Sequence, residues 1–428
     1  MFIDLHIHST ESDGTDSPAK IVEKITAESG IKIFALTDHD TITGIEKIKK
    51  ILPKEIFFIN GVEFSCKIDE NKKCHILAYF FNGEHEEFQK ILNDGRELRK
   101  KQLDIRLNYL RKIYGISFSD DDIKSICKTA VVGKPHIVNF VAEKYDIDKA
   151  KIYKDLKKCS VGDARQAAAT VIKAIKESGG VAIWAHPLGG EGEPLLSQAE
   201  FEKRLQELIN LGVQGLECYY SRYTNEQENF LVESALENNL LISGGSDYHG
   251  ANKSISLGEL GAEFPKIQIQ QLTILQKIFE KHEDSRIRKA FEISKSAHSG
   301  QVDKAGADYI FHPMTVALNC GGNISEMIVA LLHDVVEDTA FSFEELQKKI
   351  SLTSEESQAL KFLTHDKAIP YFDYISKIKT DKLATNVKIA DLEHNSDLSR
   401  IPAKIVSEKD FKRIEKYKQA LKILFDSN

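Results

Sequence analysis

Residues 2–8 read FIDLHIH, an alternating run that predicts a β-strand with one buried face. Because side chains along a strand point to opposite faces in turn, the apolar residues Ile3, Leu5 and Ile7 fall on one face. His6 and His8 then point together to the other face. Taken alone, such a pair is more often a feature of a half-exposed strand than a metal site, so its meaning depends on the rest of the sequence.

The pattern of this first strand recurs along the amino-terminal part of the chain. From residue 1 to about residue 265, short β-rich runs alternate with longer charged segments of helical period, the pattern of repeated βα units. The candidate strands are residues 2–7, 31–37, 56–59, 75–79, 181–185, 215–218 and 240–243. These strands predict an α/β fold, either a barrel or a large open sheet.

Two features divide the chain further. A helical insertion is expected at about residues 94–165, where two helical blocks replace the alternation. Its first helix is crowded with arginines, which form either a solvated helix face or an anion-facing surface. Strand signals stop after residue 265, and the chain from Ile287 onward has helical periodicity. The sequence therefore predicts two domains of unlike class, residues 1–282 and 283–428.

The composition excludes several classes of protein. The chain has 428 residues, 42% hydrophobic and 29% charged, as an ordinary globular protein of two or three domains has. A formal net charge of −7 gives no support to a protein that coats nucleic acid or a membrane surface. The six cysteines lack any paired spacing, which is typical of reduced thiols in a cytosolic protein. Since neither a signal-peptide pattern nor an apolar run of membrane length is found, we expect a cytoplasmic protein without a membrane partner.

Residues that commonly bind metals gather where the predicted strands end. They are His6, His8, Asp13, His39, Asp40, Glu63, His75, His186, Asp247 and His249. Most follow the carboxyl end of a strand, and parallel strands would bring these ends together in one basin. Each histidine alone is more readily a core residue and each aspartate a helix cap. The set as a whole favours a site for two or three divalent ions.

The order and spacing of these residues resemble the PHP (polymerase and histidinol phosphatase) superfamily over about residues 1–265. The matching runs are H-x-H at 6–8, TDHD at 37–40, AHP at 185–187 and GSDYH at 245–249, with Asp13, Glu63 and His75 between them. The resemblance implies a distorted (β/α)7 barrel that holds two or three Mn, Fe or Zn ions and hydrolyses phosphoesters. The metal ligands that it implies are His6, His8, Asp13, His39, Glu63, His75, His186, Asp247 and His249.

The inserted helices, together with GKPHIVNFV at residues 133–141, resemble one branch of this superfamily. That branch removes the 5′-phosphate from nucleoside 3′,5′-bisphosphates and AMP, or trims short RNA from 5′ to 3′. The resemblance implies that His136 contacts substrate, with Arg96, Arg99 and Arg106 as weaker candidates. Lys134, also expected at the substrate, stands where the branch usually has arginine and so lacks the bidentate fork for a phosphate.

The expected chemistry is a metal-assisted displacement at phosphorus. Adjacent ions would bind the phosphate oxygens, lower the pKa of a bridging water and offset charge on the leaving oxygen. In-line attack then requires no protein nucleophile. Asp40 is the candidate proton carrier, with the histidines of the set as alternatives.

The carboxyl-terminal part carries a second set of candidate ligands on predicted helices. In NISEMIVALLHDVVEDT, residues 323–339, the apolar residues recur at helical spacing and the polar ones gather at the carboxyl end. Glu337 follows His333 by four residues and Asp338 follows Asp334 by four, so the members of each pair lie on one helix face. A carboxylate-rich helix end that buries a His-Asp pair indicates a cation.

Further polar residues lie downstream and upstream of that helix. Asp391 and Asn395 repeat the four-residue spacing on another predicted helix, and His312 supplies a nitrogen at a turn before Pro313. Singly, a His-Asp pair on a helix is more often a cap or a surface contact. The full set is less ordinary.

Three runs resemble the HD-type hydrolase domain of the Rel/Spo family over about residues 285–428. They are AHSGQVDKAGADYIFHP at 297–313, LLHDVVEDT at 331–339 and VKIADLEHN at 387–395. The resemblance implies an all-α domain that hydrolyses the 3′-pyrophosphate of (p)ppGpp. One Mn would be bound by His312, His333, Asp334 and Asp391, with Glu337 and Asp338 orienting or deprotonating the attacking water and Asn395 contacting substrate. Because the synthetase region of the bifunctional members is absent, we predict hydrolysis without synthesis.

The sequence therefore predicts two metal phosphohydrolases in tandem, both acting on purine nucleotides with phosphate at the 3′ and 5′ positions. Two alternatives stay open. In the first, the PHP part is a 5′–3′ exonuclease on short RNA. In the second, the HD part is a nucleotide sensor or hydrolyses another nucleotide.

Overall fold

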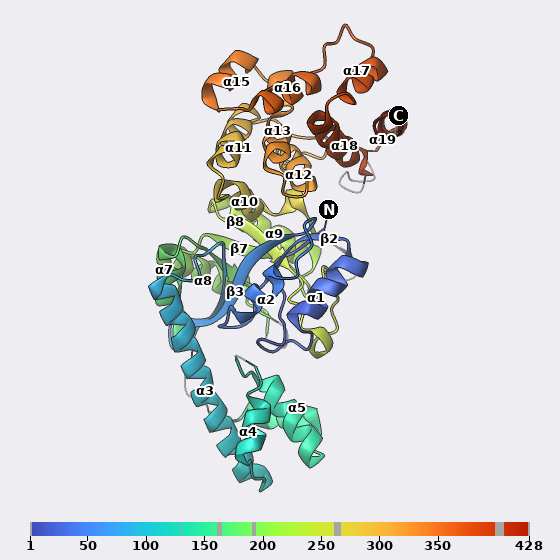
Figure 1. Ribbon diagram of the computed structural model, residues 1–428. Helices are drawn as coiled ribbons and strands as arrows, with labels where there is room; N and C mark the ends of the chain where they lie inside the picture. Colours follow the sequence, from blue (N-terminus) through green and yellow to red (C-terminus); the bar gives the residue numbers. More distant parts are fainter. Residues whose placement is uncertain are drawn as a thin grey trace. The chain divides into compact units, whose positions relative to one another are not determined.

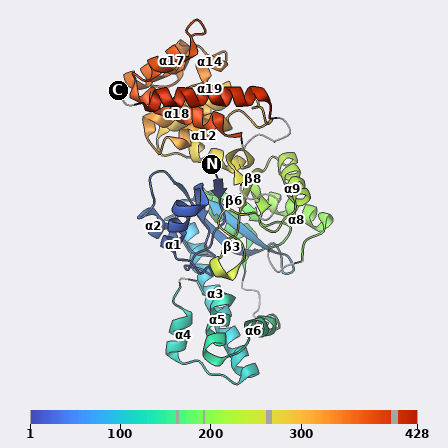
Figure 2. The ribbon, with the colours of Figure 1, turned by 90° about the vertical axis from the view of Figure 1, so that its right-hand side faces the viewer.

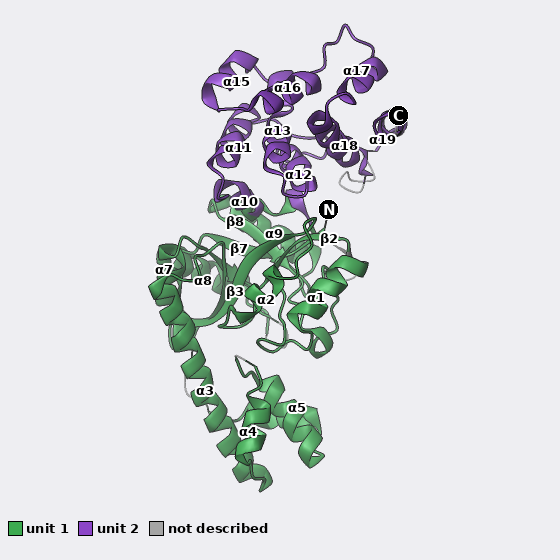
Figure 3. Ribbon diagram, in the orientation of Figure 1, with its two compact units in different colours: residues 1–267, 271–274 green, residues 268–270, 275–428 purple. Residues whose placement is uncertain are grey.

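The computed structural model describes residues 2–129, 131–160, 165–190, 194–260, 267–398 and 406–426. It divides into two compact units (Figure 3): residues 1–267 with 271–274, and residues 268–270 with 275–428. The division therefore falls between residues 267 and 275, ahead of the boundary expected at residues 282 and 283.

Among the described residues of the first unit, one nine-stranded sheet forms the centre of the fold (Figure 1). Its strands are β1 (Phe2–Asp4), β2 (Ile31–Leu36), β3 (Phe57–Lys67), β4 (Lys73–Tyr79), β5 (Gln166–Ala167), β6 (Val181–Ala185), β7 (Gly215–Tyr220), β8 (Leu241–Gly245) and β9 (Ile267–Gln268). They lie in the order β8-β7-β6-β4-β3-β2-β1-β9, with β5 beside β3. β6, with the sequence VAIWA, is buried along its whole length, as expected for a strand covered on both faces.

The two ends of the main sheet meet. Ile7, just after β1, forms a parallel bridge with Tyr248, just after β8. The backbone N–H of Leu5 donates to Gly244 O at 3.3 Å, and that of His8 donates to Tyr248 O at 2.8 Å. The sheet is therefore nearly closed, which confirms the predicted α/β barrel. The two-residue strands β5 and β9 are additions that the sequence pattern did not indicate.

β3 and β4 form an antiparallel hairpin, and β4 also runs antiparallel to β6. Asp69 stabilises the turn, because its Oδ1 accepts a hydrogen bond from the backbone N–H of Lys72 at 3.0 Å. The expectation of parallel strands is thus wrong for β4. The start of β4 lies at the same edge of the sheet as the carboxyl ends of its parallel neighbours, which places His75 opposite Ser65 and Ala185.

Helices cover the outside of the barrel. They are α1 (Pro18–Lys24), α2 (Thr43–Lys49), α7 (Ala168–Glu177), α8 (Gln198–Leu211) and α9 (Asn225–Glu237). Shorter helical turns are η1 (Ile25–Ser29), η2 (Gly250–Asn252), η3 (Ile269–Gln271) and η4 (Thr273–Leu275), of which the last two fall where the chain divides into its two units. α1 begins at Ser17, whose hydroxyl accepts from Lys20 N at 3.2 Å. Ile21 of α1 and Ile48 of α2 pack in one buried cluster with Phe34 of β2.

The insertion is a helical subdomain that projects from the barrel. Its helices are α3 (Glu86–Tyr114), α4 (Asp120–Ile126), α5 (Lys134–Tyr145) and α6 (Lys149–Leu156), and Figure 2 shows α4 and α6 on opposite sides of α5. The start of α3 packs on the barrel, where Phe88 stacks on Phe81 with 4.2 Å between ring centroids. The rest of α3 contributes Leu103 and Leu107 to a separate core shared with Ile137 of α5. Residues 130 and 161–164 of the predicted insertion lie outside the described residues.

The second unit is helical over its described residues, which confirms the predicted all-α class. Its helices are α10 (Gln276–Glu280), α11 (Ser285–Ala297), α12 (Phe311–Asn319), α13 (Ile324–Leu332), α14 (Val335–Asp338), α15 (Phe343–Lys349), α16 (Ser354–Leu363), α17 (Tyr371–Ile378), α18 (Lys382–Ser396) and α19 (Glu408–Phe425). Residues 327–332 of α13 are buried all round, as a central helix requires. Among the described residues of the whole chain, no helix combines the length and apolarity needed to cross a membrane.

Candidate metal centres and substrate cleft

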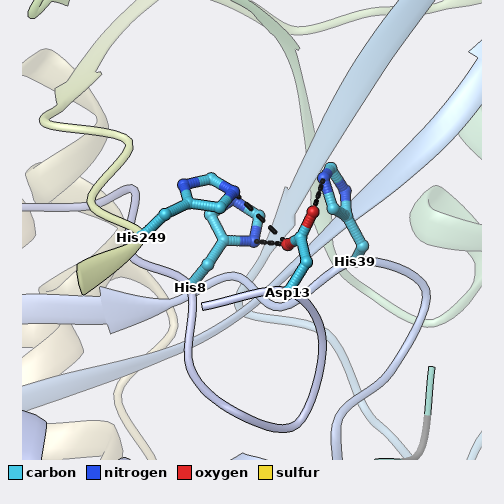
Figure 4. Close-up of side chains that lie close together, drawn as sticks. All are labelled: His8, Asp13, His39 and His249. Carbon is cyan, nitrogen blue, oxygen red and sulfur yellow. Dashed lines mark ion pairs between the residues drawn. The ribbon is translucent and has the colours of Figure 1, made fainter. Parts of the chain in front are cut away.

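The structure brings together every predicted metal ligand of the first unit at one end of the barrel. The ligand atoms form three groups, and within each group they lie within 4.8 Å of one another. The groups are His8, Asp13, His39 and His249, shown in Figure 4; His6, His8 and Asp247; and Glu63, His75 and His186. We call these side chains together the first cage.

Glu63 on β3 connects the three groups. Its Oε2 lies 3.1 Å from Nε2 of His8 and 3.2 Å from Nδ1 of His39. Its Oε1 lies 2.7 Å from Nδ1 of His75 and 3.1 Å from Nε2 of His186. A buried carboxylate that faces so many ring nitrogens is placed to bridge neighbouring cations.

Hydrogen bonds behind the first cage fix the orientation of its histidines. Nδ1 of His6 lies 2.7 Å from Oε1 of Glu217, and Nδ1 of His249 lies 2.8 Å from the carbonyl oxygen of Asp247. Because both partners are acceptors, each Nδ1 carries the proton and each Nε2 keeps its lone pair. Nε2 of His6 then faces Nε2 of His8 at 3.1 Å. Two nitrogens so close fit a shared cation.

The electrostatics of the first cage also favour cations. Burial lowers the pKa of His6, but Glu217, Asp247 and Glu63 outweigh it and raise that pKa well above its ordinary value. In the same way, burial is outweighed by Asp247 and Glu63, which raise the pKa of His8 to about 9. The buried carboxylates thus stabilise positive charge inside the barrel, as a bound cation would supply.

One buried nitrogen supports the same conclusion. Nδ1 of His39 has no hydrogen-bond partner among the described residues, and burial holds the pKa of this imidazole well below its ordinary value. A neutral buried imidazole with an unused nitrogen beside carboxylates is a ligand set that a divalent metal fits. The described residues therefore fit a metal site.

Unusual backbone conformations occur at three residues of this end of the barrel. Asp40, His186 and Asp247 have positive φ values of 51°, 29° and 57°. Residues other than glycine rarely adopt this left-handed region, because Cβ crowds the backbone there. At these places the chain leaves a strand and turns back across the barrel end.

Two buried carboxylates that support the cage were not predicted. Glu217 on β7 contacts His6, and its Oε2 also accepts from the backbone N–H of His186 at 2.7 Å. Asp38 accepts from the hydroxyl of Ser12 at 2.6 Å and so holds the loop that carries Asp13. The available signal for Glu217 was a lone carboxylate inside the otherwise apolar run GLECYY, residues 215–220.

Replacing Glu217 with glutamine is expected to lower the metal affinity and the kcat/KM of the first unit by about 10- to 100-fold each. The amide can turn its NH2 towards Nδ1 of His6, which would move the ring proton to Nε2 and block the lone pair that faces the cage. Metal analysis of the purified protein and phosphate release check this. Full metal content with unchanged activity would show that the contact does not set the tautomer.

A cleft of about 690 Å³ lies between the first cage and the insertion. Asp13, His39, His75 and His249 line it from the barrel side. Basic side chains from the insertion and the strands line the rest, and we call them the cationic band: Lys73, Arg106, Lys134, Lys157 and Arg165.

Arg106 and Lys134 of the cationic band lie close to other positive charges. Arg106 is only 6% exposed, and its Nε has no hydrogen-bond partner among the described residues. Burial, and then the nearby Arg99, lower the pKa of Arg106 to about 10. Burial and the charges of Arg106 and Arg165 likewise lower the pKa of Lys134. A bound anion would relieve this repulsion.

The predicted substrate residues occupy different positions. Lys134 and Arg99 line the cleft. His136 lies in the first turn of α5, and its Nδ1 accepts from the backbone N–H of Gly133 at 3.0 Å, which orients the ring. Arg96 does not line the cleft and donates to the side chain of Asn93.

Asp40, the predicted proton carrier, is buried next to the cleft. Its Oδ2 accepts from Nε of Arg99 at 2.6 Å, and Oδ1 accepts from the backbone N–H of Ser65 at 3.4 Å. Arg99 also donates to the Ser65 hydroxyl at 2.9 Å. Asp40 therefore fixes the guanidinium of Arg99 at the cleft wall and is not part of any ligand group.

The structure also brings together the predicted ligands of the second unit, which we call the second cage. Nε2 of His312 lies 3.2 Å from Asp334 and 3.3 Å from Asp391. Nε2 of His333 lies 3.2 Å from Asp334 and 3.8 Å from Asp391. Nδ1 of His333 lies 2.7 Å from the carbonyl of Ala330, so the proton is on Nδ1. Nε2 is buried without a hydrogen-bond partner among the described residues, which fits a cation between these carboxylates.

The other predicted residues of the second unit lie around this cage. Glu337 and Asp338 lie on α14 with part of each side chain exposed to solvent. The remaining burial raises the pKa of both carboxyl groups. Nδ2 of Asn395 donates to Oδ1 of Asp391 at 2.6 Å, so this amide holds a ligand carboxylate in place.

Three neighbours of the second cage were missed at the sequence level. Lys388, whose side chain is 14% exposed, lies 2.8 Å from Asp391, and the hydroxyl of Tyr309 donates to Asp334 at 2.8 Å. Nδ1 of His394 lies 2.7 Å from Nδ1 of His312. Only the three-residue spacing of Lys388 and Asp391 could have indicated such a contact.

Both parts of the chain are similar to known proteins. The amino-terminal part is similar to a 5′–3′ exoribonuclease of Haemophilus influenzae, 32% identical over 263 residues, 60% of this chain and 93% of that protein. It is also similar to a 3′,5′-nucleoside bisphosphate phosphatase of Chromobacterium violaceum, 24% identical over 257 residues, 58% of this chain and 87% of that protein.

The carboxyl-terminal part is similar to a guanosine-3′,5′-bis(diphosphate) 3′-pyrophosphohydrolase of Aquifex aeolicus, 35% identical over 96 residues. That match covers 22% of this chain and 13% of the relative. Both parts thus resemble hydrolases of phosphoesters or nucleotides. The family model described as the PHP domain matches residues 4–314. Since this match extends over more than half of the 428 residues, the chain belongs to the PHP domain family.

Proposed function

We propose that the first unit removes the 5′-phosphate from nucleoside 3′,5′-bisphosphates or from AMP. The supporting observation is the juxtaposition of the first cage and the cationic band in one cleft. The cage suits the phosphate that is cleaved, and the band suits a second phosphate of the same molecule. The bisphosphate phosphatase of Chromobacterium violaceum supports the substrate class.

The described residues suggest how each part would contribute. Two or three Mn, Fe or Zn ions in the first cage would supply a water of lowered pKa and neutralise charge on phosphoryl oxygens. The backbone and carboxylate contacts of the histidines keep their lone pairs directed inward. Asp40 acts as a positioning residue that holds Arg99 for substrate. Lys134 and Arg106 bind the second phosphate.

Replacing Lys134 with alanine tests the role of the cationic band. We expect kcat/KM for adenosine 3′,5′-bisphosphate to fall about 10- to 100-fold, the loss of one charge-assisted contact. AMP lacks the second phosphate, so its kcat/KM should fall much less. Lys154→Ala removes an exposed lysine of α6 that does not line the cleft and serves as the control.

Two outcomes would contradict this arrangement. An equal loss on both substrates would place Lys134 at the phosphate that is cleaved. No phosphate release from either nucleotide by the unaltered, metal-loaded chain would reject the proposed activity of the first unit.

The second unit is proposed to hydrolyse the 3′-pyrophosphate of (p)ppGpp-like nucleotides with one Mn. The observation that supports it is the second cage, where the unused Nε2 of His333 faces two carboxylates. The similarity to the Aquifex aeolicus protein supports the substrate class. If the unaltered chain binds ppGpp without hydrolysing it, this unit is a nucleotide sensor instead.

A second candidate function for the first unit is 5′–3′ exonuclease activity on short RNA, which the exoribonuclease of Haemophilus influenzae favours. Chain length distinguishes the two. A nuclease shortens labelled trimers to pentamers step by step and releases mononucleotides. A phosphatase releases inorganic phosphate and leaves the chain length unchanged.

A further inference from the structure

One aromatic side chain of the insertion faces the cleft instead of the insertion core. Tyr109, Tyr114, Phe118, Phe140 and Tyr145 all belong to the core of α3 to α6 or pack against it. Tyr153 on α6 does not pack against that core and lines the cleft. Its side chain is 37% exposed, and no hydrogen bond holds its hydroxyl among the described residues. Folding of the insertion therefore does not account for this ring.

Tyr153 is nevertheless held on a fixed support. Asp148 caps α6 by accepting from Lys151 N at 2.8 Å. Ile152 and Leu156, four residues apart on one helix face, are buried in the insertion core. Tyr153 lies about 100° around the helix from Ile152. The backbone beneath the ring is therefore rigid, and a ligand would have to order only two side-chain torsions.

The ring shares the cleft with both groups that suit phosphate. Asp13 and His249 of the first cage line the cleft, as do Arg106 and Lys134 of the cationic band. Burial, and then the Asp13 carboxylate that lines the same cleft, raise the pKa of the Tyr153 phenol. A flat apolar surface beside two anion-binding places matches the parts of a nucleotide.

We propose that the ring of Tyr153 is the platform on which the nucleobase of the substrate stacks. This inference rests on the proposed nucleotide substrate. It identifies the side chain by which the cleft would distinguish a nucleotide from a sugar phosphate. Stacking uses the face of the base, which every base has, so the platform selects for the presence of a base and not for its identity.

The test compares AMP with ribose 5-phosphate, which has the same phosphate on the same sugar but no base. Tyr153→Ala should lower kcat/KM for AMP about 5- to 150-fold and leave that for ribose 5-phosphate within about twofold. Tyr153→Phe keeps the ring and should keep AMP turnover. Ile113→Ala, which removes a 41% exposed apolar side chain of α3 outside the cleft, is the matched control.

A binding measurement separates this inference from the proposed reaction. With the metal-loaded chain, titration calorimetry of adenosine and ribose, which carry no phosphate to be cleaved, should show adenosine binding the unaltered chain more tightly than ribose. Tyr153→Ala should remove that difference. Equal binding of the two ligands, or an equal loss of both in Tyr153→Ala, overturns the platform whether or not hydrolysis is detected. Binding as proposed with no phosphate release would reject only the activity.

Discussion

Replacing Glu63 with glutamine should reduce phosphate release by the first unit at least about a thousandfold, equivalent to about 4 kcal/mol of transition-state stabilisation. Glu63 is 1% exposed and faces histidines of all three ligand groups. Glutamine has nearly the same shape, but its NH2 would direct hydrogens at the place of a cation. Metal content per chain and kcat/KM for AMP are the measurements.

Glu70→Gln is the control, because Glu70 lines the same cleft and lies outside the ligand groups. Its metal content and activity should stay near those of the unaltered chain. Full activity in Glu63→Gln would mean that the first cage is not where phosphorus is attacked. A folded Glu63→Gln variant, established by circular dichroism, excludes unfolding as the cause.

The second large effect is expected in the other unit. The double substitution Glu337→Gln with Asp338→Asn should lower hydrolysis of ppGpp by about 10²- to 10⁴-fold, the usual contribution of general acid–base catalysis. Both carboxylates are exposed on α14, one turn beyond His333 and Asp334, and neither belongs to the ligand group of the second cage. The bound metal should therefore be retained. Pyrophosphate release and metal analysis on the same sample check both statements.

The first unit provides the internal control for this double variant, since its AMP turnover should not change. Asp366→Asn removes another carboxylate of the second unit outside the ligand group and should leave ppGpp hydrolysis intact. Unimpaired ppGpp hydrolysis by the double variant would mean that other groups orient and deprotonate the attacking water. Loss of the metal together with activity would make Glu337 and Asp338 supports of the cage instead of proton carriers.

The barrel could be predicted because each βα unit carries its own local pattern, such as the alternation in FIDLHIH. The direction of β4 could not, because an alternating run of residues is the same whether its neighbours are parallel or antiparallel. The turn at Asp69 decides that direction, and with it the position of His75. Closure of the sheet between Ile7 and Tyr248 depends on contacts between distant parts of the chain.

Most cage ligands could be predicted in the same way, since they follow strand ends in recognisable runs. Glu63 lies within β3 and His75 near the start of β4, so the rule does not cover them. Glu217 lies within a strand and contacts His6 more than two hundred residues away, so no spacing reveals it. On α3, Arg99 and Arg106 are seven residues apart and share a face, which lines the cleft, whereas Arg96 is turned about 60° from Arg99. Ranking these arginines required the phase of the helix relative to the barrel, which only the folded chain provides.

The left-handed backbone at Asp40, His186 and Asp247 sets a limit on how this protein can be improved. Glycine would relax each position, and selection for heat resistance would favour it. Each such exchange would remove a side chain that the proposed reaction uses: a metal ligand at His186 and Asp247, and the support of Arg99 at Asp40. Thermal stability and catalysis therefore compete at these three positions. Stabilising substitutions have to be sought in the helices that surround the barrel.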